Sequence, residues 1–513
     1  MSRRKLVIKN SYLTRQMMDR RGFLKVAGLL ACWPSRIFGV SSKSSGVWVN
    51  DVHSALNPTL VEQMITMDSI DVIQKTVRQA RKDGKIVSVA GGRHAMGGQQ
   101  FGTGTLLLDI TPSHRVLNLD KDKGIVEVEA GIQWPELIDR LSIMQAGEAK
   151  VWTIAQKQTG TDRLTLGGSL AANAHGRGLR MKPIVNNVES FTLVDATGEV
   201  QRCSRQENKE LFRLVIGGYG LFGVVYSIQL RLVPRQKVRR VVEVAELENL
   251  PRLFEKHIQD GFLYGDFQFS CDEKSDDFIR SGILSCYQPV DERTPLSEVR
   301  KELSASGWEE LLYLAHVDKS TAFQKYARHY LETNGQIYWS DLQQIGVYLD
   351  GYHERLDKKL GTPNPGSEVI TEIYVPRDAL SRFIQNVRND FRKNHVNLIY
   401  GTIRLIEEDD ETFLAWAKQS YACVIFNLHT VHTEEGLEHS RDAFRRLIDL
   451  AIQENGSYYL TYHRHATKRQ VETCYPQFVE FLNLKRKFDP GEVFQSDWYR
   501  HYRDMFRKEL DNK

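Results

Sequence analysis

A glycine-rich loop directly after a short apolar strand constrains the fold of this chain more than any other feature. Residues 86–90 predict a buried strand, and the loop Ala90-Gly91-Gly92-Arg93-His94-Ala95-Met96-Gly97-Gly98-Gln99 follows it. Glycine lets a backbone turn tightly and approach a ligand closely. The exposed N–H groups of such a turn form a nest for pyrophosphate oxygens. The loop therefore favours a phosphate-binding site with His94 beside the ligand, although a tight surface turn with a solvated histidine fits the pattern equally well.

A second run of small residues follows the first loop. It reads Gly167-Gly168-Ser169-Leu170-Ala171-Ala172-Asn173-Ala174-His175-Gly176 and is preceded by Gln158-Thr159-Gly160. Small residues let the start of a helix touch a ligand, and close helix packing requires them too. The run predicts either a further part of the same binding site or a tightly packed helix.

The third run, Gly218-Tyr219-Gly220-Leu221-Phe222-Gly223, fits the pattern G-x-G-x-x-G. In the Rossmann dinucleotide-binding fingerprint this pattern follows a strand and opens a helix. Here a predicted helix over 207–216 precedes the pattern and a predicted strand over 224–233 follows it. Because this order is inverted, we reject a Rossmann site for a nicotinamide cofactor.

The order of predicted elements divides the chain into two folded regions. A length of 513 residues allows several domains of ordinary size. Up to Pro234 short strands alternate with helices, among them a helix over 69–82. Residues 241–290 and 368–462 then both follow the order strand, helix, strand, strand, and residues 295–360 between them are mostly helical. This order predicts an antiparallel sheet with helices on one face.

The three glycine-rich runs, together with a Leu-Asp-Ile strand at 108–110 and a closing segment at 481–494, resemble the vanillyl-alcohol oxidase superfamily, also called PCMH-type FAD-linked oxidoreductases. The branch nearest in appearance holds the aldonolactone and alditol oxidases. The resemblance covers residues 60–235 well, and the region before the closing segment only in pieces. It implies an α+β, two-domain PCMH-type FAD-binding fold with an antiparallel-sheet substrate (cap) domain. We expect an FAD-binding domain (47–235), a cap domain (236–465) and a C-terminal segment returning to the FAD-binding domain (466–513), preceded by a twin-arginine export signal and leader (1–46) for which the N-terminus gives separate evidence below.

The resemblance implies FAD lying extended between the two domains. In many relatives a histidine in the first glycine loop is bonded covalently to the 8α-methyl of the flavin, and His94 matches that position. Arg93-His94-Ala95 departs from the commoner Gly-His-Ser, which leaves the bond open. No cysteine lies between Thr159 and Ser169, so a second covalent bond is not expected. The implied cofactor-binding residues are Gly91, Gly92, Arg93, His94, Ala95, Gly97, Gly98, Thr159, Gly160, Gly167, Gly168, Ser169, Asn173, His175, Gly176, Gly218, Gly223 and Val225.

Two predicted strands of the cap domain resemble those that face the flavin in the aldonolactone and alditol branch. They are Glu372-Ile373-Tyr374-Val375-Pro376 and Tyr400-Gly401-Thr402-Ile403-Arg404. The resemblance makes Glu372 and Arg404 candidate catalytic residues, with Arg404 as a fixed cation beside the reduced flavin. An ordinary cross-strand ion pair, worth little if exposed, is the alternative.

Two pairs of histidines remain to be interpreted. His463 and His465 are two apart on a predicted strand and point the same way, whereas His429 and His432 are three apart and point oppositely. Zinc requires three or four convergent ligands, and no carboxylate motif accompanies these pairs, so we expect no metal site. A role for His463 as catalytic base fits better, because neutral imidazole takes up a proton near pH 7.

These features predict an FAD-dependent oxidoreductase that oxidises a CH–OH group of a sugar, polyol or aldonolactone by hydride transfer to flavin N5. The expected partners are this small-molecule substrate and either oxygen or a periplasmic electron acceptor. The alternatives are an amine or phenolic alcohol as substrate, or a non-catalytic exported binding protein on a flavin fold. Nucleic acid is not expected as a partner, because the chain beyond residue 40 has a net charge of −4.

The basic N-terminus explains why the whole chain has a net charge of +4. Arg20-Arg21-Gly22-Phe23-Leu24-Lys25 before a short apolar run resembles a twin-arginine export signal, which implies a translocase partner and a periplasmic location. A basic amphipathic helix is the alternative. Cys32 loosely matches a lipid-anchor site, and Cys271 and Cys286 are candidates for a disulfide in an oxidising compartment.

Overall fold

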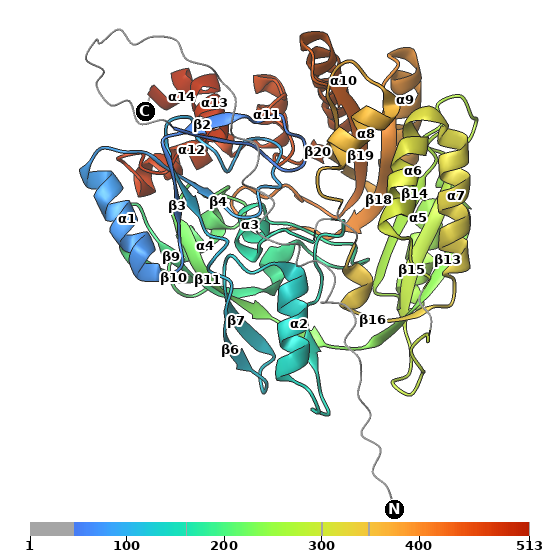
Figure 1. Ribbon diagram of the computed structural model, residues 1–513, viewed down its shortest axis with the longest axis horizontal. Coiled ribbons are helices and arrows are strands. Elements are labelled where there is room, and N and C mark those ends of the chain that lie inside the picture. Colours follow the sequence, from blue (N-terminus) through green and yellow to red (C-terminus); the bar gives the residue numbers. More distant parts are fainter. Residues whose placement is uncertain (1–45, 161, 299–300, 347–348, 512–513) are drawn as a thin grey trace, which may run out of the picture. The chain divides into compact units, whose positions relative to one another are not determined.

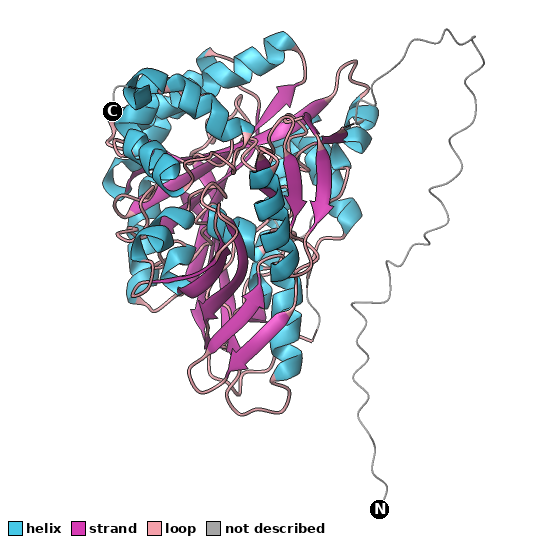
Figure 2. Cartoon of the chain, turned by 90° about the vertical axis from the view of Figure 1, so that its left-hand side faces the viewer, coloured by secondary structure: helices cyan, strands magenta, loops and turns pink. Residues whose placement is uncertain are grey.

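A computed structural model describes residues 46–160, 162–298, 301–346 and 349–511. The fold is α+β, as predicted, with one small parallel sheet and larger antiparallel sheets (Figures 1 and 2). The predicted export signal and Cys32 lie outside the described residues. No helix in the described ranges is long and apolar enough to cross a membrane.

The first glycine loop begins at the end of β4, which belongs to a three-stranded parallel sheet with the order β3-β5-β4. Helix α1 packs its apolar stripe of Ile73, Val77 and Ala80 into the core, as the helical spacing predicts. Ser69 stands at its N-cap, and Gly84 ends the helix region with a φ of +64°. The elements are β3 (Gln63–Thr66), α1 (Ile70–Lys82), β4 (Val87–Ala90) and β5 (Leu106–Asp109).

A five-stranded antiparallel sheet with the order β10-β9-β11-β7-β6 completes the first part of the chain. An antiparallel hairpin within residues 116–129 forms its edge, and Pro135 sits in the first turn of the helix that follows. The elements are β6 (Val116–Asp120), β7 (Ile125–Glu129), α2 (Trp134–Met144), α3 (Leu166–Ala171), β9 (Val188–Val194), β10 (Val200–Ser204), α4 (Lys209–Val215) and β11 (Val224–Arg231). Two short pairs accompany them, β1 (Val47–Val49) with β2 (Thr59–Val61) and β8 (Trp152–Thr153) with β12 (Val233–Pro234).

The second part is built on an antiparallel sheet of eight strands in the order β16-β13-β15-β14-β18-β19-β17-β20. The repeated order strand, helix, strand, strand is confirmed in both halves. The first half consists of β13 (Lys237–Glu246), α5 (Leu250–Gln259), β14 (Tyr264–Phe269) and β15 (Ser281–Pro289). The second half consists of β17 (Gly366–Pro376), α9 (Leu380–Lys393), β18 (Leu398–Ile406), β19 (Tyr421–Val431) and α10 (Glu434–Gln453).

The two faces of this sheet differ in character. One face is apolar and is covered by helices α9 and α10, and Phe391 of α9 packs on Phe426 of β19. The opposite face carries polar side chains, because the register pairs Glu372 with Ile425 and Arg404 with Cys423. Paired residues of neighbouring strands share a face, so the polar groups of several strands gather there.

The prediction that helices cover only one face is incomplete. Helices from the segment between the two halves reach the polar face, where Tyr326 of α7 bonds Gln268 of β14 (Figure 1). Neither α6 nor α7 has a buried residue, which is why hydrophobic periodicity did not reveal their position. The elements are α6 (Ala305–Val317), α7 (Lys319–Glu332), β16 (Ile337–Trp339) and α8 (Tyr352–Leu360).

Residues 493–495, near the end of the chain, pair with β4 of the first part, where red and blue elements meet in Figure 1. The Val87 N–H donates to the Val493 carbonyl at 2.7 Å, and the Gln495 N–H donates to the Val87 carbonyl at 2.9 Å. This pairing extends β4 by a parallel bridge to Phe494. The elements are β20 (Ser457–Tyr458), α11 (Lys468–Cys474), α12 (Phe478–Phe488), α13 (Asp497–Met505) and α14 (Arg507–Asp511).

Two local expectations are wrong. The strand that was expected to carry His463 and His465 is limited to β20, and residues 459–466 form a loop, so neither histidine is on a strand. Cys271 and Cys286 do not pair, since both are buried free thiols. Cys271 follows β14, whereas Cys286 lies within β15 opposite Gly265.

Candidate active site

A segment of the first part crosses the polar face of the eight-stranded sheet. The Tyr264 hydroxyl donates to the Ala155 carbonyl at 2.7 Å, which anchors the beginning of the segment. Arg404 Nη2 donates to Thr159 Oγ1 at 2.7 Å, and His175 Nε2 lies 2.8 Å from Glu372 Oε2. The fold thus places the second glycine run against the two strands that were predicted to face a cofactor.

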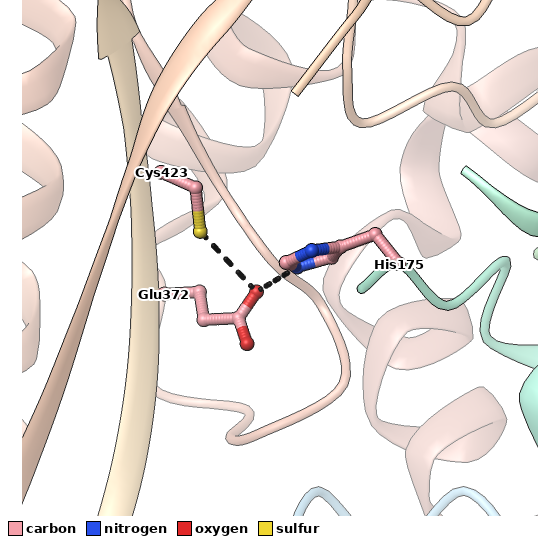
Figure 3. A group of neighbouring side chains, drawn as sticks. All are labelled: His175, Glu372 and Cys423. Atoms are coloured by element: carbon pink, nitrogen blue, oxygen red, sulfur yellow. Dashed lines mark hydrogen bonds and ion pairs between the residues drawn. The ribbon is translucent and has the colours of Figure 1, made fainter. Parts of the chain in front are cut away.

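Glu372 is the centre of a buried hydrogen-bond network on this face (Figure 3). Its side chain is 1% exposed, and its Oε2 accepts from His175 Nε2 and, at 2.9 Å, from the Tyr374 hydroxyl. Oε1 accepts from the Tyr462 hydroxyl at 2.6 Å. Burial alone would raise the pKa of Glu372, but the positive charge of His175 and these hydrogen bonds hold it below its ordinary range.

The other nitrogen of His175 fixes the charge of the pair. His175 Nδ1 lies 3.0 Å from the Gly176 carbonyl, which can only accept, so Nδ1 carries a proton. A neutral His175 would then turn the lone pair of Nε2 toward the carboxylate. A second proton on the ring removes this repulsion, and we therefore interpret the contact as a charged His175–Glu372 pair.

Cys423 is the third member of the group in Figure 3. Its Sγ lies 3.8 Å from Glu372 Oε2, and the ligand atoms of His175, Glu372 and Cys423 lie within 4.8 Å of one another. Burial, together with the nearby charge of Glu372, raises the pKa of the Cys423 thiol well above its usual value. Because a thiolate is the form that ligates metals, this group is poorly suited to bind one.

Several buried polar atoms on the same face lack a hydrogen-bond partner within the described part of the chain. They include Arg404 Nε, Thr402 Oγ1 and Asn427 Oδ1. Their strands place these side chains on the face that carries Glu372, by the pairings of Thr402 with Ile425 and of Tyr400 with Asn427. Buried polar groups are normally paired, so these atoms fit a site that receives a polar ligand.

The first glycine loop packs directly on the start of the second run. A Cβ added to Gly91 would lie 2.1 Å from Thr165 Oγ1, and one added to Gly92 would lie 2.3 Å from the Arg163 carbonyl. The loop also reaches the second part, because the Gly97 N–H donates to the Thr461 carbonyl at 3.1 Å. The glycines are therefore required for contacts between loops as well as for the approach of a ligand.

His94 is buried within this loop, with 8% of its surface exposed. Burial, assisted by the nearby His53 and Arg163, lowers the pKa of His94 to about 4. The imidazole is therefore neutral at pH 7, and it keeps the lone pair that a covalent bond to a flavin requires. Arg93 beside it adopts a φ of +59°, and Gly98 a φ of +75°.

Some residues that were predicted to bind the cofactor form hydrogen bonds within the protein instead. Ser169 Oγ accepts from Trp134 Nε1 at 3.1 Å, and Asn173 Nδ2 donates to Asp409 Oδ2 at 2.8 Å. The remaining backbone contacts show a similar pattern. The Gly167 N–H donates to the Ala130 carbonyl, the Gly168 N–H to Thr165 Oγ1, and the Gly176 N–H to Gln156 Oε1.

The third glycine run forms the turn between α4 and β11, which is the inverted order that argued against a Rossmann site. A Cβ added to Gly218 would lie 2.0 Å from the Leu214 carbonyl, and Gly223 has a φ of +145°. Val225 pairs with Leu193 in the five-stranded sheet. Gly160 of the second run, by contrast, has a φ of +87° and an open space where a side chain would be.

The structure does not bring His463 to Glu372. His463 Nε2 lies 3.2 Å from Thr371 Oγ1, and its ring stacks on Phe444 of α10 with centroids 4.4 Å apart. Thr371 and Glu372 are successive residues of β17 and point to opposite faces. His463 therefore lies on the apolar face, where burial holds its pKa well below the usual value. This position argues against its predicted role as catalytic base.

Tyr374, Tyr462 and Cys423 were not among the predicted site residues. Strand alternation from Glu372 would have indicated Tyr374, which is two residues further along β17. Cys423 required the register of β19 against β17, and no sequence pattern fixes it. Tyr462 comes from an irregular loop, for which the sequence carries no signal.

The first glycine loop, the second glycine run and the polar atoms left without a partner within the described residues of the opposing face fit a bound FAD. Comparison with known proteins also points to FAD. Residues 61–204 match the family described as FAD binding domain. Cytokinin dehydrogenase 5 of Arabidopsis thaliana is 25% identical, over 92% of this chain and 89% of the relative. An L-gulono-1,4-lactone dehydrogenase of Mycobacterium tuberculosis is 22% identical, over 83% and 92%. The decaprenylphosphoryl-beta-D-ribose oxidase of Mycolicibacterium smegmatis is 22% identical, over 86% and 95%.

The matched domain and the site together define a flavoprotein that binds FAD. More narrowly, the chain is an FAD-linked oxidase or dehydrogenase with an α+β fold consistent with the PCMH type.

Proposed function

We propose that this enzyme oxidises a CH–OH group of a sugar, polyol or aldonolactone. The observation that carries the proposal is the polar face over which the second glycine run lies, where Arg404 and the His175–Glu372 pair are buried together. Relatives named for a gulonolactone and for a ribose support this substrate class. Their names as oxidases and dehydrogenases favour an enzyme over a non-catalytic binding protein.

FAD, when bound, accepts hydride at N5 and so supplies the redox chemistry. We propose that the loop from Gly91 to Gly98 and the run from Thr159 to Gly176 hold it, with the neutral His94 as the residue that bonds it covalently. Arg404 then provides a fixed cation beside the reduced cofactor. Its guanidinium is oriented by Thr159, so the same contact joins the cation to the cofactor-binding segment.

Glu372 is the proposed acceptor of the proton from the substrate hydroxyl. The Tyr462 hydroxyl donates to Glu372 Oε1 and accepts from Gln158 Nε2 at 3.1 Å. In this arrangement Tyr462 passes its proton to Oε1 and takes up the proton of the substrate. His175 and Tyr374 orient the carboxylate by binding its other oxygen.

A second candidate substrate class is supported by the cytokinin dehydrogenase relative, which is named for neither a lactone nor a ribose. An amine or phenolic alcohol therefore remains the alternative donor. An anaerobic screen separates the classes: polyols, aldonolactones, amines and phenolic alcohols are mixed with the yellow holoprotein, and loss of absorbance near ~450 nm is followed. Bleaching by polyols or aldonolactones supports our proposal. Bleaching by amines or phenolic alcohols alone refutes it.

We further propose that the chain is exported through the twin-arginine translocase to the periplasm, with a lipid anchor at Cys32 as one form of attachment. The flavin is then reoxidised by oxygen or by a periplasmic electron acceptor. The support is the Arg20-Arg21 pair before a short apolar run. Replacing both arginines by lysine should retain the protein in the cytoplasm, and unchanged delivery to the periplasm would refute export by this route.

A further inference from the structure

Two histidines and a glutamate converge at a point outside the network described above. Glu368 lies on β17, and His429 lies directly opposite it in the register of β19. His316 reaches the same carboxylate from the last turn of α6. Glu368 Oε1 is 3.1 Å from His316 Nε2 and 3.3 Å from His429 Nδ1, and the ligand atoms of all three residues lie within 4.8 Å of one another.

We propose that His316, Glu368 and His429 bind a divalent metal ion of the zinc type. Two imidazoles and a carboxylate are a common ligand set for zinc, which leaves a fourth position for water. Ligands about 2.1 Å from a tetrahedral zinc ion lie about 3.4 Å from one another, close to the two nitrogen-to-oxygen distances in the cluster. The two imidazole rings stand edge to face, with centroids 4.7 Å apart, and each places one nitrogen beside the carboxylate.

Hydrogen bonds hold the side chains around Glu368 in place. Its Oε2 accepts from the Tyr352 hydroxyl at 2.6 Å, which fixes the orientation of the carboxylate. His353 Nε2 lies 2.7 Å from the His53 carbonyl and must carry the proton of that hydrogen bond. Hydrogen bonds of this kind typically orient residues around a bound metal.

A further imidazole lies beside the same carboxylate. His353 Nδ1 is 3.1 Å from Glu368 Oε2, so nitrogens of three histidines surround the Glu368 side chain.

The location suggests what the ion does. Helix α6 contributes no buried residue, so apolar packing fixes it only weakly to the sheet. His316 joins α6 to strands β17 and β19 at the proposed site. The ion therefore anchors the helical insertion, which covers part of the polar face. This site is independent of the substrate class proposed above.

The sequence argued against metal at His429 and His432 because no carboxylate motif stands beside them. The structure supplies Glu368 from another strand and His316 from a helix more than a hundred residues earlier. His432 does not join the site, since its Nε2 lies 2.8 Å from Ser367 Oγ.

The test uses the full-length holoprotein without an affinity tag, dialysed against EDTA. Zn²⁺ is titrated by calorimetry, and Co²⁺ is added separately to detect the visible absorption of a tetrahedral site. We expect one equivalent of Zn²⁺ to bind and to raise the melting temperature. His316→Ala and His429→Ala should each weaken binding at least tenfold and abolish the thermal shift.

His114→Ala is the matched control, because His114 Nδ1 forms an exposed pair with Glu136 Oε1 at 3.0 Å. This variant should bind Zn²⁺ like the parent. Flavin absorbance shows whether each variant is folded, and Glu368→Gln, which keeps the size of the side chain, replaces any alanine variant that is not. Absence of stoichiometric binding in the parent, or binding that is unchanged in folded variants of the cluster, overturns the proposal.

Discussion

Replacing Glu372 by leucine and by glutamine should have very different effects on stability. In the parent, the buried carboxylate accepts from His175, Tyr374 and Tyr462. Leucine leaves these three donors buried without a partner, at about 1–3 kcal/mol each. Breaking a buried charge pair costs about 3–5 kcal/mol. We therefore expect Glu372→Leu to lower the free energy of unfolding by about 3–6 kcal/mol.

Glutamine can satisfy the same neighbours without a charge. His175 keeps the Nδ1 proton that it donates to Gly176, so as a neutral ring it presents a lone pair at Nε2. The amide NH₂ donates to this nitrogen, and the amide oxygen accepts from Tyr462. The hydroxyl of Tyr374 only has to rotate. The expected loss for Glu372→Gln is about 1–2 kcal/mol, since charge-assisted hydrogen bonds are replaced by neutral ones.

The assay is urea unfolding of purified holoproteins, followed by tryptophan and flavin fluorescence. The pKa of Glu372 is lowered in the folded protein, so its stabilisation is present above the unfolded value near ~4.3 and is lost as the pH falls through the folded value. The difference between the parent and Glu372→Gln should therefore stay constant above about pH 5 and shrink as the pH falls below ~4.3. If Glu372→Leu and Glu372→Gln lower the free energy of unfolding equally, our assignment of the buried network is wrong. The same holds if Glu372→Leu lowers it by less than about 1 kcal/mol.

Three further predictions concern single residues of the site. Arg404→Ala should slow flavin reduction by at least about tenfold, or about 1.4 kcal/mol, with little change in melting temperature; equal rates of anaerobic bleaching would count against its role. After acid precipitation, yellow fluorescence should stay in the pellet of the parent and be lost from that of His94→Ala, whereas free FAD in the parent supernatant would exclude the covalent bond. His463→Gln should leave the pH profile of flavin reduction unchanged, because His463 lies on the opposite face from Glu372, and a shifted profile would return it to the site.

The regular elements could be predicted because local patterns determine them. The apolar spacing of α1 and the two repeated units of the eight-stranded sheet follow from periodicity and turn residues. Helices α6 and α7 show where such reasoning fails. They have no buried apolar face, so their position depends on polar contacts such as the one between Tyr326 and Gln268.

The candidate site was predicted only in part, for a related physical reason. The resemblance made Glu372 and Arg404 candidates, and the structure brings both to the segment that holds Thr159 and His175. His463 was misplaced because a loop was interpreted as a strand, and a loop does not preserve the alternation of faces. The partners of Glu372 depend on strand register and on an irregular loop, which long-range packing decides.

The most direct test of the central claim is the anaerobic reduction of the holoprotein by a donor labelled at the reacting carbon. A polyol or aldonolactone that bleaches the flavin is compared with the same compound carrying deuterium at the CH–OH carbon. If hydride leaves that carbon, the deuterated donor should bleach the flavin several-fold more slowly and should yield one carbonyl product per reduced flavin. A purified protein without flavin, or a flavin that no hydroxyl donor reduces, would contradict the account.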